Sequence, residues 1–447
     1  MIIQKFGGSH FTDAKPFINF LNILNNSTDR TVIVISALGK TTRLLQSAAF
    51  SAELHNREEW ERDLAEIEKF HNDLICKLNL SKDVINNFNE FMINKIDNLR
   101  QYFTSIEVLE ELTPRTLDNV LAYGEEISLF IFANYLAANS IHFSEIDARE
   151  IITTDDNFND ANPNLEKIQQ NINEKLIPLF ENTSIILTQG FIGSNENHET
   201  TTMGFESSNL TAVLLAYSMN AKEIIIWTNV EGIHVADPNL VGNARFIPYI
   251  SFADANLSAS YGNKLFYTKM LQICEKNNIH IYYKSIFNPD GNSTILQNEH
   301  TSSIPMMNIL DGLSQMSYNG IHTSKISLSN EEVYPEFFRN FKLFTHNPEN
   351  IKLLLVSNNN ISFWTDLHLG HFSIPKTLIN EGQSIIYILN INPISFLKFV
   401  SDNSEFFSRY EFTMAQIQKD IYAIALDSEI SREVSNKINE YLLSLPE

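Results

Sequence analysis

The sequence contains very little cysteine, and this scarcity limits how the folded chain can be stabilised. Its 447 residues include two cysteines, Cys76 and Cys274, which lie far apart along the chain. Two thiols in so long a chain do not form a disulfide framework. Both lie in apolar stretches with helical character. We therefore predict two buried, reduced thiols in a protein of the cytoplasm.

Positive charge is scarce as well. Lysine and arginine total 32 against 54 aspartates and glutamates, which gives a formal net charge of −22. Such a surface repels phosphate backbones and anionic membranes, so we expect no nucleic-acid partner and no membrane partner. An anionic ligand would need a local cluster of positive groups.

Long hydrophobic runs are missing too. No stretch approaches the roughly 20 apolar residues of a membrane span. No basic segment followed by a long apolar run opens the sequence, so we expect no signal peptide. Hydrophobic residues still make up 43% of the chain, which is enough for sizeable cores. The length predicts two or three domains.

Apolar strands alternate with helices through the first two-thirds of the chain. Residues 31–36 are a continuous β-branched run, typical of a strand that is buried on both faces. This alternation predicts an α/β fold, an open sheet sandwiched by helices. We predict further strands at 184–188, 223–227 and 279–283, and helices at 58–80, 84–103, 114–138 and 251–277.

The first strand runs directly into a glycine pair. The segment Lys5-Phe6-Gly7-Gly8-Ser9 ends an apolar strand, and glycine lets backbone N–H groups approach a ligand closely. The lysine ammonium suits phosphate oxygens. Taken alone, the same segment also fits a surface lysine beside a tight turn.

A second glycine-lysine pair follows the next strand. Gly39-Lys40-Thr41 looks like the end of a P-loop, but the glycine that this motif requires five positions earlier is Val34. The better interpretation is a strand-to-helix turn. Hydroxyl groups flank that turn at Ser36 and Thr42, and ordinary capping of the next helix is the alternative role for them.

Further motifs follow in order. Glu125, after Gly124, is an acidic residue within an apolar helical segment, which is costly unless it has a partner. The alternative is a solvated Glu125 with Glu126 beside it. A strand then ends in Gln189-Gly190-Phe191-Ile192-Gly193, and Thr201-Thr202-Met203-Gly204 leads into a helix whose N-terminus suits an anion.

Together with residues 226–233 (IWTNVEGI), these motifs resemble those of the aspartate kinases of the amino-acid kinase family. The resemblance covers roughly residues 1–295. It implies phosphoryl transfer from ATP, with Mg²⁺, to the side-chain carboxylate of L-aspartate. The product is 4-phospho-aspartate, and the reaction is the first step of lysine, threonine and methionine biosynthesis.

The resemblance also implies roles for individual residues. The expected catalytic groups are Lys5 and Lys264, with Lys269 as a substitute for Lys264 if its helix is shifted by a turn. No metal ligand is assigned, and Asp147-Ala148-Arg149 is expected to shape the substrate wall. The nucleotide is expected at Lys5, Gly7, Gly8, Ser9, Thr228, Asn229 and Lys264, and the substrate at Ser36, Thr42, Glu125, Phe191 and Ser208.

Several positions depart from the family pattern. Phe205 stands where the arginine that pairs with the substrate α-carboxylate is expected, and Asn209, Asn229 and Asn239 also replace charged residues. Tyr267 and Thr268 replace a His-Pro pair. Aspartate kinase remains the first interpretation. The alternatives are a catalytically impaired relative that senses a ligand or regulates a partner, or a kinase for a different carboxylate or small substrate.

The composition changes near residues 296–315, and residues 297–303 form a polar stretch typical of a linker. Beyond it we predict strands at 352–356, 361–365, 384–389 and 421–425, with a closing helix to Leu443. The pattern resembles paired α+β modules of the ACT type. We predict a catalytic domain at 1–295 and a regulatory region at 305–447. This region is expected to form a homodimer and to bind an amino-acid effector, with residues 358–360 as a candidate loop or an ordinary turn.

Overall fold

The computed structural model describes residues 1–26, 29–204, 207–263, 265–298, 303–319, 341–347, 350–355 and 377–445. By its internal contacts the chain divides into two units that alternate along the sequence. The first comprises residues 1–233, 248–256 and 264–301, and the second comprises 234–247, 257–263 and 302–447. The domain boundary near residue 300 stays a prediction.

The first unit is built on an eight-stranded sheet with the strand order β10-β12-β11-β7-β1-β2-β4-β3. All neighbouring strands run parallel except β11 and β12. This confirms the predicted open α/β sheet. The strands are β1 (Ile2–Phe6), β2 (Thr31–Ile35), β3 (Ser144–Glu145), β4 (Ile185–Gln189), β7 (Glu223–Thr228), β10 (Tyr249–Ser251), β11 (His280–Ser285) and β12 (Ser293–Gln297).

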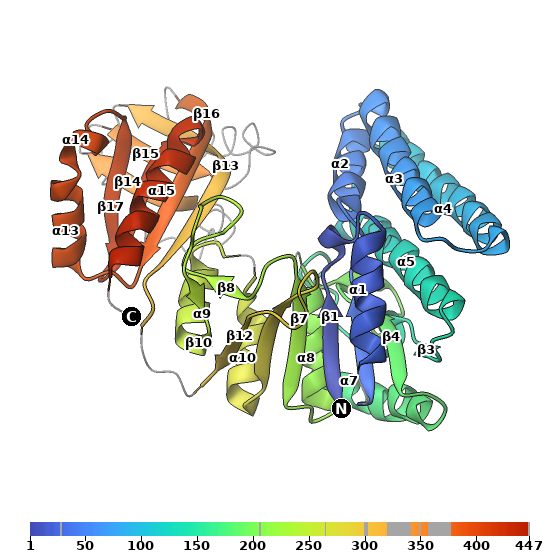
Figure 1. Ribbon diagram of the computed structural model, residues 1–447. Helices are drawn as coiled ribbons and strands as arrows, with labels where there is room; N and C mark the ends of the chain where they lie inside the picture. Colours follow the sequence, from blue (N-terminus) through green and yellow to red (C-terminus); the bar gives the residue numbers. More distant parts are fainter. Residues whose placement is uncertain are drawn as a thin grey trace. The chain divides into compact units, whose positions relative to one another are not determined.

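Helices flank this sheet, as Figure 1 shows for α1 (Ala14–Asn25) and α8 (Ser208–Ser218) on either side of β1. An aromatic cluster joins α1 to the sheet, because the ring of Phe20 meets Phe6 at 4.8 Å and Phe17 meets Phe132 of α5 (Pro114–Ala138) at 5.0 Å. Such buried rings contribute strongly to the hydrophobic core. The core therefore lies directly beneath the strand that ends in the glycine pair.

Side-chain caps set the starts of the long helices. Asn56 caps α3 (Arg57–Lys77), Ser81 caps α4 (Lys82–Leu109), and Thr113 with Pro114 begins α5. A capping oxygen satisfies one of the N–H groups that a helix start leaves unpaired. The three predicted helices are thus confirmed, with α5 at the predicted bounds. The shorter elements are α2 (Thr41–Glu53), α6 (Ala148–Ile151), α7 (Leu165–Asn171), η1 (Gly8–His10), η2 (Ile172–Leu176), η3 (Ile177–Glu181), β5 (Ile192–Ser194) and β6 (Thr200–Thr202).

The second unit contains a six-stranded antiparallel sheet in the order β14-β15-β13-β16-β18-β17. With its helices it is consistent with the expected α+β region of ACT-like modules. Residues 358–360 and the strand expected at 361–365 lie outside the described residues. The elements are β8 (Ile233–His234), β9 (Phe246–Ile247), β13 (Met306–Asn319), β14 (Phe341–Asn347), β15 (Asn350–Leu355), β16 (Thr377–Leu389), β17 (Phe412–Gln418), β18 (Ile421–Asp427), α13 (Pro393–Asp402), α14 (Ser404–Phe407) and α15 (Ser428–Ser444).

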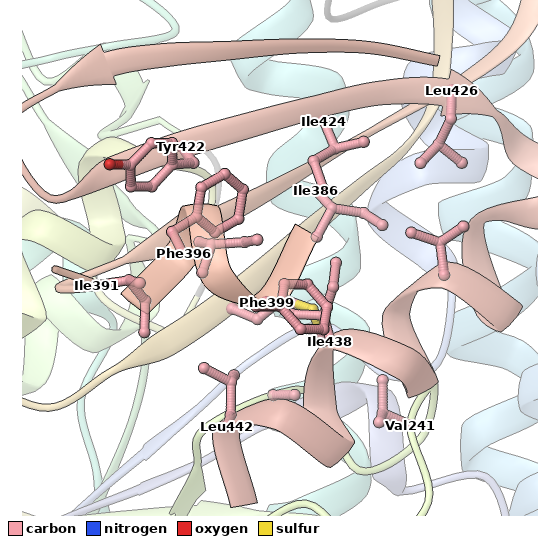
Figure 2. Close-up of a cluster of buried hydrophobic side chains, with 14 of the residues drawn as sticks. Val241, Ile386, Ile391, Phe396, Phe399, Tyr422, Ile424, Leu426, Ile438 and Leu442 are labelled. Carbon is pink, nitrogen blue, oxygen red and sulfur yellow. The ribbon is translucent and has the colours of Figure 1, made fainter. Parts of the chain in front are cut away.

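The core of the second unit gathers side chains from β16, β18, α13 and α15. Figure 2 shows Phe396 and Phe399 facing Ile386 and Ile424 across this core. Val241 joins them from the segment 234–247, which precedes the rest of this core by many residues in sequence. The second unit thus needs a piece of chain from the middle of the sequence.

Two sequence-based predictions are wrong. The helix expected at 251–277 is two helices, α9 (Phe252–Ser260) and α10 (Thr268–Asn277), separated at Gly262, whose φ of +93° is incompatible with a continuing helix. Cys76 is exposed, while Cys274 is buried as expected. Cys76 has apolar neighbours in the sequence, but it lies on the exposed side of the last turn of α3.

Candidate active site

The glycine pair after β1 is held by close packing against the loop after β2. A Cβ on Gly8 would lie 1.9 Å from the backbone oxygen of Ala37, so only glycine fits. The N–H of Gly39 donates to the Gly8 oxygen at 3.0 Å. The two loops at the ends of these parallel strands therefore form one surface, with the exposed Ser9 at its edge.

A buried lysine and a buried glutamate lie beside these loops. Lys5 is 9% exposed and Glu125 is 2% exposed. Burial raises the pKa of Glu125 to about 8, although the Ala37 N–H and the charge of Lys5 pull it down. One carboxylate oxygen of Glu125, Oε2, has no hydrogen-bond partner among the described residues. The carboxyl group is thus poised to receive a cation.

The solvated alternative for Glu125 is wrong. Its neighbour Glu126 is paired with Lys95 and, at 2.9 Å, with Arg149. Arg149 also pairs with Asp147 at 2.6 Å. These groups line a cavity of about 670 Å³ beside α5, so the Asp147–Arg149 segment lies next to Glu126.

Helix α5 fixes several loops through polar side chains on its buried face. The hydroxyl of Ser128 donates to the Ser36 oxygen at 2.8 Å. Asp118, fully buried, accepts from the N–H and the hydroxyl of Thr202 at 2.9 and 2.6 Å. Burial raises the pKa of Asp118 despite these donors. Asp118, Glu125 and Ser128 recur at helical spacing on one face.

Of the two residues proposed to hold the substrate through a hydroxyl group, Ser36 contacts this face through its backbone oxygen. The Ser36 hydroxyl is buried without a hydrogen-bond partner among the described residues, and Thr42 is half-buried in the first turn of α2. Residue Lys40 precedes α2 and no side chain caps it. The capping role is therefore not observed for Ser36 or Thr42, and both hydroxyls remain candidates for ligand contacts.

The glycine after β4 allows helix α8 to approach. A Cβ on Gly190 would lie 2.7 Å from the Cβ of Ser208. Phe191 has a φ of +71° and is buried, and its N–H donates to the Thr211 hydroxyl at 3.2 Å. Asn209 is 5% exposed, and its Oδ1 has no hydrogen-bond partner among the described residues. Phe205 lies outside the described residues.

The end of β7 lies beside the glycine pair. The N–H of Gly7 donates to the oxygen of Trp227 at 3.4 Å, which brings Thr228 and the exposed Asn229 beside the glycine pair. The Thr228 hydroxyl donates to the Val230 oxygen at 2.9 Å and so shapes the turn. Lys264 lies outside the described residues, and Lys269 is paired with Asp160 at 2.9 Å.

Sequence reasoning missed His10. It follows the glycine pair, and its Nδ1 lies 3.2 Å from the Ser9 hydroxyl. Burial and the charge of Lys5 lower the pKa of His10 to about 4, so the imidazole is neutral at pH 7. Sequence reasoning also missed Asp118 and Ser128. The signal that could have identified them is the occurrence of polar residues on the apolar, buried face of a helix.

No metal-like cluster of three or more His, Cys, Asp or Glu side chains occurs in the described part of the chain. Nor does any helix within the described ranges combine the length and apolarity needed to cross a bilayer.

The chain resembles known proteins in sequence over about its first two-thirds and in fold over nearly its whole length. A model described as the amino acid kinase family matches residues 1–285. The lysine-sensitive aspartokinase 3 of Escherichia coli is 27% identical over 312 residues, covering 69% of this chain and 67% of that protein. The chloroplastic aspartokinase 1 of Arabidopsis thaliana is 30% identical over 66% of this chain. This match spans about half of the Arabidopsis protein, 51% of its length.

Solved structures show the same fold. E. coli aspartokinase III in complex with aspartate and ADP, in the R-state, has a TM-score of 0.79 at 22% identity, over 99% of this chain and 100% of that one. The same enzyme with lysine and aspartate, in the T-state, has a TM-score of 0.72 at 22% identity over the same shares.

Proposed function

The chain belongs to the amino acid kinase family, and we propose that it phosphorylates the side-chain carboxylate of L-aspartate with ATP. One observation carries the proposal. The buried Lys5 lies just before the glycine pair after β1, and its charge acts on the buried carboxyl group of Glu125, so a phosphate and an ammonium could be held near each other there. The relatives named as aspartokinases, and the solved complex with aspartate and ADP, support the choice of substrate.

The substrate would be oriented by groups from both sides of the site. Glu125 would hold its ammonium, and that positive charge would restore the ionised carboxylate that burial disfavours. Hydroxyls of Ser36, Thr42 and Ser208 would hold its oxygens, with Phe191 as the wall. Positioning of this kind supplies much of the catalysis in phosphoryl transfer.

The phosphates would lie against Lys5, Gly7, Gly8 and Ser9, with Thr228, Asn229 and Lys264 completing the nucleotide site. MgATP would supply the phosphoryl group. An oxygen of the substrate carboxylate forms the new bond to the γ-phosphorus while the bond to the bridging oxygen of ADP breaks, and no protein nucleophile is needed. Lys5 and Lys264 would neutralise charge that develops during transfer.

The remaining parts of the proposal concern the biological setting. The product, 4-phospho-aspartate, would enter lysine, threonine and methionine biosynthesis in the cytoplasm. The second unit would form a homodimer and bind an amino-acid effector, as one relative is named lysine-sensitive and one solved complex contains lysine.

A second candidate function rests on Asn209. Its buried Oδ1 has no hydrogen-bond partner among the described residues, and Phe205 stands four positions earlier where the family pattern has arginine. An uncharged pair at these positions favours a substrate without an α-carboxylate, or a retired site that only senses a ligand. Loss of a buried charge partner costs about 2–5 kcal/mol.

The deciding experiment traps the acyl phosphate as a hydroxamate with MgATP and L-aspartate. Turnover by the natural chain that disappears in Lys5→Ala supports aspartate kinase. Absence of turnover, with ADP still bound and activity gained in Phe205→Arg/Asn209→Asp, would replace it with the second candidate. The matched control is Lys284→Ala. It also removes a lysine, but one to which the proposal gives no role and whose ammonium lies over the ring of Trp227 on β7.

A further inference from the structure

The imidazole of His10 lies against the first glycine of the pair that follows β1. A Cβ built on Gly7 would lie 3.3 Å from His10 Nε2 and 3.6 Å from the backbone oxygen of Trp227, so the missing side chain leaves room for the ring. The N–H of Gly7 donates to that same oxygen at 3.4 Å. Because this N–H is already engaged, the polar group that the turn offers beside Gly7 is the imidazole of His10.

The Ser9 hydroxyl holds the other nitrogen of the ring. It lies 3.2 Å from His10 Nδ1. A hydroxyl can both donate and accept, so it can donate to Nδ1 of a neutral ring and accept from Nδ1 of a charged one. In both states a proton then sits on Nε2, the nitrogen beside Gly7. The pair of Ser9 and His10 can therefore offer an N–H donor at the glycine turn whether the ring is neutral or charged.

The surroundings of the ring keep it neutral in the free chain. Burial, followed by the charge of Lys5 on β1, lowers the pKa of His10 to about 4. The charge of Lys5 also acts on Glu125 of α5, the titratable group on the facing helix. An anion bound beside Lys5 and His10 would oppose the lowering of the His10 pKa, because a nearby negative charge favours the protonated imidazole.

We propose that His10 is a phosphate-binding residue, which donates a hydrogen bond from Nε2 to a phosphate oxygen of the nucleotide and takes up a proton from solvent as the nucleotide binds. The inference rests on the proposed function for the identity of the ligand. It adds a second positive charge to that of Lys5, in a chain whose net charge of −22 otherwise repels anions. The ring is neutral in the free chain above about pH 4 and charged in the complex, so nucleotide binding should tighten as pH falls through the pKa of the complex.

The test measures MgADP binding by calorimetry at pH 6 and pH 8, in buffers with different enthalpies of ionisation, so that proton uptake is measured directly. The natural chain should take up protons and bind MgADP more tightly at pH 6. His10→Gln keeps a donor that does not titrate. In this variant the uptake should disappear and binding at pH 6 should weaken by about tenfold, the effect of a hydrogen bond between charged groups. At pH 8 the two chains should differ by less than about threefold.

The matched control is His142→Gln. It removes a histidine to which the proposal gives no role and whose Nε2 lies 2.9 Å from the Asn182 oxygen. Uptake and affinity should match those of the natural chain. A loss in His142→Gln as large as that in His10→Gln would overturn the inference.

A further variant separates His10 from the other titratable group near Lys5. Burial raises the pKa of Glu125 to about 8, so this carboxyl group already holds a proton at pH 6. The uptake at pH 6 should therefore persist in Glu125→Gln. Uptake that vanishes in Glu125→Gln, or that survives in His10→Gln, would overturn the inference.

Hydroxamate trapping with L-aspartate separates this inference from the proposed function. If MgADP binding shows the uptake that depends on His10 while aspartate is not turned over, the inference stands and the proposed substrate is wrong. If aspartate is turned over while MgADP binds without proton uptake, the inference is wrong and the proposed function stands. A chain that does not bind MgADP at all would contradict both.

Discussion

The two sides of the candidate site are built differently. On the α5 side, Gly8, Glu125 and Ser128 fix the loops after β1 and β2 through close packing and buried hydrogen bonds. On the α8 side, Phe205 and Asn209 replace charged residues of the family pattern. The side that would hold the cationic group of a substrate is complete, whereas the side that would hold its anionic group carries no matching charge at these two positions.

This difference indicates which side of the candidate site would tolerate a change of ligand. A buried carboxylate such as Glu125 is costly without a ligand, so its presence together with Lys5 indicates a site built for a charged ligand. The buried Oδ1 of Asn209, which has no hydrogen-bond partner among the described residues, costs less than an unpaired buried charge would. We therefore expect the α8 side to accept a wider range of ligands than the α5 side, where a cation would restore the ionised carboxylate of Glu125.

The largest effect is expected from a substitution that disrupts the packing of the loops on the α5 side. Gly8→Ala would place a Cβ 1.9 Å from the Ala37 oxygen. Because backbone must move, we expect about 3 kcal/mol of lost stability and loss of activity. Denaturant unfolding checks it. Gly242→Ala is the control, since nothing lies within 4 Å of a Cβ there. Equal stability of Gly8→Ala and the natural chain would show that the loops are not locked together.

The second largest effect is expected from restoring charge on the α8 side. Phe205→Arg/Asn209→Asp should lower the KM for L-aspartate by tenfold or more, because a restored charged contact is worth at least about 1.5 kcal/mol. Steady-state kinetics with the KM for ATP as internal reference checks it. An unchanged aspartate KM would mean that these positions do not face the substrate.

The two neighbouring glutamates give a pH test. The pKa of Glu125 is about 8 in the folded chain and 4.5 when unfolded, so the folded form holds a proton that the unfolded chain releases. The contribution of Glu125 to stability should therefore be fully present below pH 4.5 and be lost as pH rises toward 8, by about 1.4 kcal/mol per pH unit at most. Glu125→Gln should remove this fall and be the more stable form at pH 8.

Glu126→Gln is the control for that experiment. Its carboxylate is paired with Lys95 and Arg149, so the substitution should cost about 1 kcal/mol while the pH slope of unfolding persists. Thermal unfolding between pH 5 and pH 8 measures both variants. A slope that persists in Glu125→Gln would assign it to another group.

The smallest expected effect concerns Ser128. Ser128→Ala removes the hydrogen bond to the Ser36 oxygen and should cost about 1 kcal/mol, with a rise of a few-fold in the KM for the carboxylate substrate. Ser105→Ala, which removes a bond within α4 at the surface, should leave that KM unchanged. Identical kinetics for both variants would show that α5 does not position Ser36.

The sequence was sufficient to predict the sheet, the long helices and the glycine turns, because each has a local signal. Gly8 and Glu125 were found through motifs of neighbouring residues. Asp118 and Ser128 were not, because their partners at residues 202 and 36 come from distant segments that helical periodicity alone cannot identify. The break at Gly262 follows from its positive φ, which the glycine suggested only after the fold was known.

The interleaving of the two units has a consequence for anyone who divides the chain. A fragment that ends near residue 295 would still contain residues 234–247, yet it would lack the strands and helices that bury Val241. Its apolar side chains would meet water, which promotes aggregation. A single cut therefore cannot separate the two units, because residues 234–247 belong to the second unit whereas residues 264–301, further along the chain, belong to the first.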